Sequence, residues 1–121
     1  MDADFIRDLF SEFGPVDVRR MFSGAGVYAD GVIFALVLRD ALWLTADERS
    51  APRFEAEGCR RFDYVRKSGR RGHLPYWRMP DRLYDDPAEL ADWARQALAV
   101  ARARKAAKVK RKTRSGKKKR P

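Results

Sequence analysis

The sequence predicts a small α+β domain with an antiparallel sheet, in which one helix, four strands, a short helix, two strands and a long helix follow one another. Three observations predict it. Asp30-Gly31 and Arg39-Asp40 mark two-residue turns between apolar runs, so residues 21–45 divide into adjacent strands. Apolar residues recur at helical spacing near both ends of the chain and supply helices to cover such a sheet. A length of 121 residues favours one domain.

The chain is expected to begin with a helix and a strand, followed by an antiparallel meander over residues 21–45. Apolar residues recur at helical spacing from Ile6 to Phe13 and predict an amphipathic helix over residues 3–13. Residues 16–22 are β-branched and partly alternating, which predicts a strand leading into the meander. The middle segment of the meander, residues 32–38, reads VIFALVL and has no polar face, so we expect a central strand that is covered on both sides or packed at a partner surface.

A short helix and a second hairpin follow the meander. Asp47 or Ser50 is expected to cap the helix, which ends near a glycine. Residues 61–67 and 74–79 alternate in polarity and predict two strands of a hairpin. Because proline donates no ladder hydrogen bond, Pro75 favours an edge position for its strand.

The last predicted element is a long helix with a strong start signal. Asp86 is the expected cap, Pro87 the first helical residue, and Glu89 completes a capping-box pattern. Ser115-Gly116 is expected to end the helix, and the final residues are expected to be disordered. One apolar stripe runs along the helix, formed by Leu90, Trp93, Ala94, Ala97, Leu98 and Ala101.

Charge divides the chain into two expected parts, a domain over residues 1–101 and a Lys/Arg-rich tail over residues 102–121. The domain holds 15 basic and all 17 acidic residues, a net charge of −2, whereas the tail holds 12 basic residues and no acidic one. The formal charge of +10 therefore belongs to the tail. Such an arrangement predicts a polyanionic partner, DNA or RNA, although a merely solubilising tail is the alternative.

The sequence gives little indication of catalysis or of a cofactor. His73 is the only histidine and reads as a solvent-facing loop residue, and Cys59 is the only cysteine, either a reactive thiol beside two arginines or a buried one. Asp85 and Asp86 are explained by helix capping. Four large aromatic residues, Trp43, Tyr76, Trp77 and Trp93, are expected to pack in the core rather than form a stacking platform. We therefore expect no enzyme activity and no cofactor, and the absence of a leader or long apolar run predicts a cytoplasmic protein without membrane contact.

Several blocks of the sequence resemble a known family when taken together in order. They are MFSGAGVYADGVIFAL, LWLTADE, FEAEGCRRFDYV, PYWRMP and DDPAELADWARQAL, and they look like the amino-terminal domain of the TfoX/Sxy proteins from about Phe5 to Ala101. The resemblance implies an α+β domain in the style of the secretion-chaperone-like folds. It also implies a role in transcriptional regulation of natural competence beside the cyclic-AMP receptor protein. Full-length members carry a second, helical domain where this sequence has its basic tail.

The sequence thus predicts a non-enzymatic TfoX-like regulator that contacts a transcription-related protein, forms a homodimer, and adds nonspecific nucleic-acid affinity through its cations. The alternative is a protein-interaction or chaperone-like module without a nucleic-acid role. Two sets of cations are the expected nucleic-acid contacts, although the hairpin set is equally consistent with an ordinary solvated loop. The hairpin set comprises Arg66, Lys67, Arg70 and Arg71, and the tail set comprises Arg102, Arg104, Lys105, Lys108, Lys110, Arg111, Lys112, Arg114, Lys117, Lys118, Lys119 and Arg120.

Overall fold

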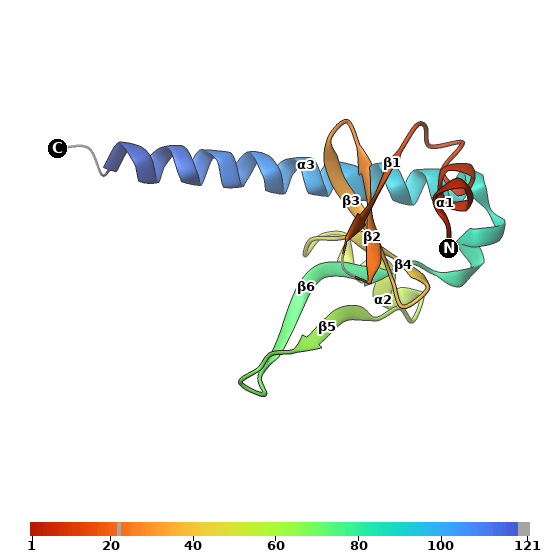
Figure 1. The fold of residues 1–121 in the computed structure, drawn as a ribbon, viewed down its shortest axis with the longest axis horizontal. Helices are drawn as coiled ribbons and strands as arrows, with labels where there is room; N and C mark the ends of the chain where they lie inside the picture. Colours follow the sequence, from red (N-terminus) through yellow and green to blue (C-terminus); the bar gives the residue numbers. More distant parts are fainter. Residues whose placement is uncertain (22, 119–121) are drawn as a thin grey trace.

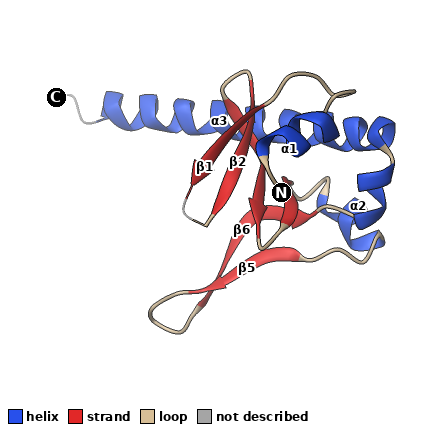
Figure 2. Ribbon diagram, turned by 45° about the vertical axis from the view of Figure 1, so that its right-hand side comes forward, coloured by secondary structure: helices blue, strands red, loops and turns tan. Residues whose placement is uncertain are grey.

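The computed structural model describes residues 1–21 and 23–118, and of residues 111–118 it describes the helical backbone. Within this part of the chain it shows the predicted α+β architecture, with a six-stranded antiparallel sheet in the order β1-β2-β3-β4-β6-β5 (Figures 1 and 2). The elements are α1 (Ala3–Leu9), β1 (Asp17–Met21), β2 (Gly24–Ala29), β3 (Val32–Leu38), β4 (Ala41–Thr45), α2 (Ala51–Ala56), β5 (Arg61–Val65), β6 (Arg71–Arg78), the short 3-10 helix η1 (Asp81–Asp85) and α3 (Pro87–Lys118).

Both predicted turns of the meander are confirmed. Asp30 and Gly31 have φ angles of 51° and 76°, and Arg39 and Asp40 have φ angles of 52° and 57°. These positive values match the right-handed twist of the strands they join. The turns therefore fix β2, β3 and β4 side by side.

The central strand β3 is covered on both faces, as its apolar sequence predicts. Alternation along β4 shows the two faces, because Leu42 and Leu44 lie in the main hydrophobic cluster and Trp43 lies in a second, smaller cluster. The second cluster also contains Leu36 and Phe62, and the Trp43 and Phe62 rings meet edge to face at 5.0 Å. The sheet thus has one large core and a smaller aromatic cluster on its other face.

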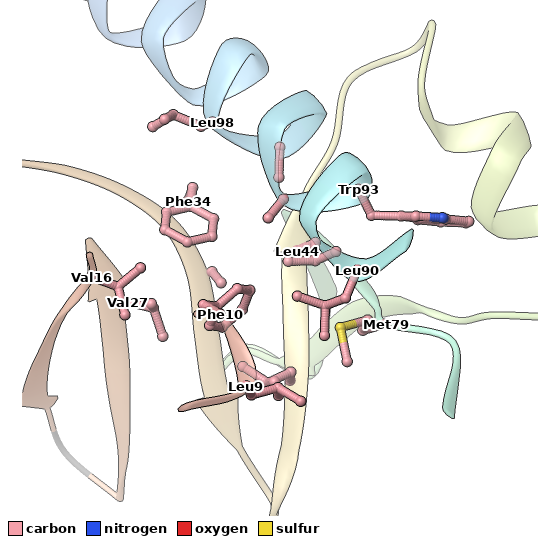
Figure 3. Close-up of a cluster of buried hydrophobic side chains, with 14 of the residues drawn as sticks. Leu9, Phe10, Val16, Val27, Phe34, Leu44, Met79, Leu90, Trp93 and Leu98 are labelled. Atoms are coloured by element: carbon pink, nitrogen blue, oxygen red, sulfur yellow. The ribbon is translucent and has the colours of Figure 1, made fainter. Parts of the chain in front are cut away.

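The large core lies between the sheet and helices α1 and α3 (Figure 3). Ile6 and Phe10 from the first segment, Phe34 from β3 and Leu90 from α3 are fully buried. Every member of the predicted α3 stripe is less than 10% exposed, from Leu90 to Ala101. Burial of these side chains holds α3 across the sheet.

The prediction that Pro75 lies on an edge strand is wrong. β6 is an inner strand between β4 and β5, although its pairing with β5 shifts register between Arg61 and Asp63. The Ala46 carbonyl oxygen, which an N–H at position 75 would face just past the last pair of the β4–β6 ladder, accepts a hydrogen bond from Arg104, so no ladder acceptor is left unpaired by Pro75. The Pro75 carbonyl oxygen accepts hydrogen bonds from the Ala46 N–H and the Thr45 hydroxyl.

The helix boundaries differ from prediction at two places. α1 ends at Leu9 rather than at residue 13, because the chain passes into turns that Gly14 closes with a φ angle of 136° and an N–H donated to the Phe10 carbonyl. The expected end of α3 at Ser115-Gly116 is also wrong, since the helix continues to Lys118. The predicted cap of α3 is confirmed, with the Glu89 N–H donating to the Asp86 carboxylate at 3.1 Å.

Candidate functional site

The first cations of the tail set contact the body of the protein. Arg104 donates to the Thr45 hydroxyl oxygen at 2.9 Å and to the Ala46 carbonyl at 3.0 Å, from a half-buried position. Arg102 forms an exposed ion pair with Asp30 in the β2–β3 turn, at 2.6 Å. These two arginines therefore fasten α3 to the ends of β2 and β4, a role that their charge alone did not indicate.

A groove of about 420 Å³ lies beside this fastening point. Tyr28 and Tyr76 line it from the sheet, and Arg104, Lys105 and Lys108 line it from α3. Its lining contains no acidic side chain. Both lysines are exposed and form no ion pair with another described residue. The groove thus combines an aromatic wall with available positive charge.

The helical repeat explains why the basic side chains reach this groove. Ala101 is the last member of the buried apolar stripe, and Lys105 and Lys108 follow it at i+4 and i+7. Residues at this spacing share one face of a helix. The face of α3 that packs on the sheet therefore continues as a basic face at Lys105 and Lys108, on the part of the helix that extends past the sheet (Figure 1 shows the course of the helix).

The other tail cations follow along α3. Lys110 is exposed. Arg111, Lys112, Arg114, Lys117 and Lys118 lie on the helical backbone that extends away from the sheet (Figure 1). Lys119 and Arg120 lie outside the described residues, as does the predicted disorder of the final residues.

The hairpin set lies at the exposed tip of β5 and β6. Arg66, Lys67, Arg70 and Arg71 are all exposed, and a hydrogen bond from the Arg66 N–H to the Arg70 carbonyl closes the turn at 2.8 Å. Arg71 is 3.7 Å from Asp63, which offsets part of the charge. Figures 1 and 2 show this tip pointing away from α3. The two predicted basic sets are therefore not brought together in one surface.

The residues considered for catalysis lie in different parts of the fold, Cys59 between α2 and β5 and His73 on β6. Burial raises the pKa of the Cys59 thiol, with nearby Glu57 acting in the same direction, which favours the buried-thiol alternative over the reactive one. His73 is exposed as predicted but lies on β6 rather than in a loop. No group of three or more His, Cys, Asp or Glu residues with metal-binding geometry exists among the described residues.

Tyr28 and Thr45 were not identified as site residues from the sequence, because both lie within strands whose pattern indicates only packing. Tyr76 was assigned to the core, yet it is partly exposed and lines the groove. Burial raises the pKa of its phenol, and the nearby Arg104 acts in the opposite direction. The only available signal was that Tyr28 and Thr45 stand at strand ends, next to turns.

No helix in the described part of the chain combines the length and the apolar composition that a bilayer crossing requires.

Comparison with known proteins identifies the family. The TfoX N-terminal domain family matches residues 8–101. A similar relative is DNA transformation protein TfoX1 of Aliivibrio fischeri, which is 28% identical over 91 residues. This match covers 75% of the present chain and 43% of the relative, so the chain spans less than half of that protein's length. Since the matched segment contains the whole sheet and the packed part of α3, the chain belongs to the TfoX N-terminal domain family.

Proposed function

We propose that the chain is a non-enzymatic regulator of transcription that contacts proteins through its α+β body and nucleic acid through the basic extension of α3. The observation that carries this proposal is the continuous basic extension of α3. No acidic residue follows Asp92 in the sequence, and α3 runs unbroken from the core to Lys118. A stiff cationic helix of this kind favours contact with a phosphate backbone.

The family supports the regulatory part of the proposal. The name of the Aliivibrio fischeri relative connects that protein with DNA transformation, and the resemblance to TfoX/Sxy proteins implies regulation of competence. We extend this role to the present chain as a protein that acts beside a transcription-related partner. The tail would supply affinity without sequence readout, because phosphate contacts carry no base information.

A salt titration of DNA binding tests the nucleic-acid part. Binding of the full-length protein to a fluorescent DNA duplex is measured by anisotropy across a range of salt concentrations. If half of the twelve tail cations meet phosphates, log K falls against log salt with a slope of about −5. Each phosphate contact that a substitution removes should reduce this slope by about 0.9.

Two variants of equal charge separate the two basic sets. The tail variant carries Gln at Lys110, Lys112, Lys117 and Lys118, and the hairpin variant carries Gln at Arg66, Lys67, Arg70 and Arg71. We expect the slope to become shallower in the tail variant and to stay at the wild-type value in the hairpin variant. An unchanged slope in the tail variant contradicts the proposal, and equal losses in both variants would show a general charge effect instead.

The alternative function is protein interaction alone, and the second hydrophobic cluster favours it. Half-buried Leu38, Leu74 and Tyr64 surround the buried Leu36 and Trp43 on that face. If this face joins two copies in the predicted homodimer, Leu74→Lys should lower the sedimentation coefficient to that of a monomer. A monomeric wild-type protein in the same measurement would contradict the homodimer.

A further inference from the structure

The groove between α3 and the sheet has the features of a ligand site that the basic tail alone does not require. Its volume of about 420 Å³ lies within the range of roughly 300–1,000 Å³ that is typical of small-molecule pockets. It lies where α3 passes the β2–β3 turn, the end of β4 and the inner part of β6. A duplex backbone lying along the helix would not need such a concave aromatic wall.

The tyrosine hydroxyls in the groove are available to a ligand. Neither Tyr28 nor Tyr76 donates or accepts a hydrogen bond through its hydroxyl within the described residues, whereas the Thr45 hydroxyl is engaged by Pro75 and Arg104. Both rings are partly exposed and line the same groove, and the Arg19 guanidinium lies over the Tyr28 ring at 4.6 Å, so a base can stack only on the other face of that ring. A tyrosine phenol is protonated near neutral pH and can therefore donate, and burial raises the pKa of Tyr76 further above that range.

The three basic residues of the groove differ in whether they are bonded to the protein or available to a ligand. Arg104 is held by its hydrogen bonds to Thr45 and Ala46. Lys105 and Lys108 have no such partner among the described residues and stand one turn apart on α3. With no acidic side chain in the lining, an anion next to these two ammonium groups meets no repulsion from the groove itself.

We propose that this groove holds one nucleotide unit of a single strand, with the base against Tyr28 and Tyr76 and the phosphate beside Lys105 and Lys108. Aromatic side chains within a cationic groove bind unpaired bases, because every base offers a flat apolar face. In a duplex these faces are already stacked and cannot enter. The inference rests on the proposed nucleic-acid function and adds to it a preference for single strands.

Binding of a labelled oligothymidylate and of a duplex of equal length tests this preference in the full-length protein. We expect Tyr28→Leu to weaken binding of the oligothymidylate by at least about 5-fold, the lower end for loss of one stacked base. Duplex binding should stay within 2-fold of wild type. The matched control is Tyr64→Leu, a half-buried tyrosine on β5 outside the groove, which should leave both affinities unchanged.

A double Lys105→Gln and Lys108→Gln variant tests the phosphate side. Its salt slope with the oligothymidylate should be shallower by about 1.4, the value for two single-strand phosphate contacts. A strand that carries 5-iodouracil gives a direct readout, because ultraviolet cross-linking followed by mass spectrometry should label the peptides that contain Tyr28 or Tyr76. Labelling confined to other peptides overturns the assignment.

The outcomes separate this inference from the proposed function. One outcome overturns the groove assignment and leaves the proposed function standing. In it, the wild-type protein binds duplex with the expected salt slope, but the Tyr28→Leu variant, shown to be folded by its circular dichroism spectrum, binds the oligothymidylate as tightly as wild type. If wild type binds neither nucleic acid, both fail. A competition with thymidine monophosphate distinguishes a strand from a free nucleotide as the ligand. If the monophosphate displaces the labelled oligothymidylate at equal nucleotide concentration, the groove takes a free nucleotide rather than a strand.

Discussion

Replacement of Arg104 by methionine isolates the contribution of the contact that fastens α3 to the sheet. Methionine keeps much of the apolar stem that packs along the surface and removes the guanidinium group. Two hydrogen bonds are lost, to Thr45 at 2.9 Å and to Ala46 at 3.0 Å. Hydrogen bonds to charged groups contribute roughly 1.5–3 kcal/mol each, but Arg104 is only half-buried and water partly replaces its bonds. We therefore expect Arg104→Met to lower the free energy of unfolding by about 1–2 kcal/mol.

Urea unfolding followed by tryptophan fluorescence measures this loss, since Trp43, Trp77 and Trp93 all pack within or against the hydrophobic clusters. Arg102→Met is the matched control, because Arg102 makes an exposed ion pair with Asp30 whose expected contribution is about 0–1 kcal/mol. The reasoning is refuted if Arg104→Met destabilises the protein no more than Arg102→Met does, since both variants remove one positive charge from the same turns of α3.

Three further predictions concern the body. Gly24→Ala should lower the free energy of unfolding by about 2–3 kcal/mol or more, because the added Cβ would lie 2.0 Å from the Val37 carbonyl oxygen. The comparison variant is Gly31→Ala, where the Cβ meets no neighbour and only the φ angle of 76° is unfavourable. It should lower the free energy of unfolding by about 1–2 kcal/mol in the same urea assay. Hydrogen bonds from Ser50, chiefly its backbone N–H, lower the pKa of the Asp47 carboxyl from 3.8. The stability that this carboxylate provides is therefore present above pH 3.8 and is lost as the pH falls through its lowered pKa, so Asp47→Asn should flatten the acid limb of a pH-dependent unfolding curve. Cys59 should react with iodoacetamide at pH 8 more slowly than free cysteine, because burial raises its pKa; an equal rate in the folded protein, compared with a urea-unfolded control, would contradict this.

Local signals were sufficient for most of the fold. Asp30-Gly31 and Arg39-Asp40 specify their turns through backbone preferences that do not depend on distant contacts, and both formed as expected. The stripe beginning at Leu90 also reports directly which helix face packs inward. Element type and order were therefore predictable from short stretches of sequence.

Features that depend on contacts between distant segments were not predictable in the same way. Pro75 was assigned to an edge strand from its missing N–H, whereas the inner position of β6 depends on pairing with β4, more than 30 residues earlier in the chain. The groove shows the same limit. It exists because Lys105 and Lys108 arrive opposite Tyr28 and Tyr76, and that register is set by packing of α3 on the sheet. The sequence therefore shows which residues are cationic, but it does not show which of them lie opposite the aromatic side chains of the groove.

The continuity of α3 links folding of the tail to the binding of polyanions. Forming the first turn of a helix is unfavourable, but here the turns from Leu90 to Ala101 are already fixed by the core, so the basic segment only extends an existing helix. Like charges at i and i+4, such as Lys108 and Lys112, oppose that extension by a few tenths of a kcal/mol per pair. Phosphates placed along the basic face would remove this repulsion. Binding of a polyanion should therefore stabilise the outer turns of α3. A more stable helix should in turn keep its cations in a fixed arrangement, which lowers the entropy cost of binding further phosphates.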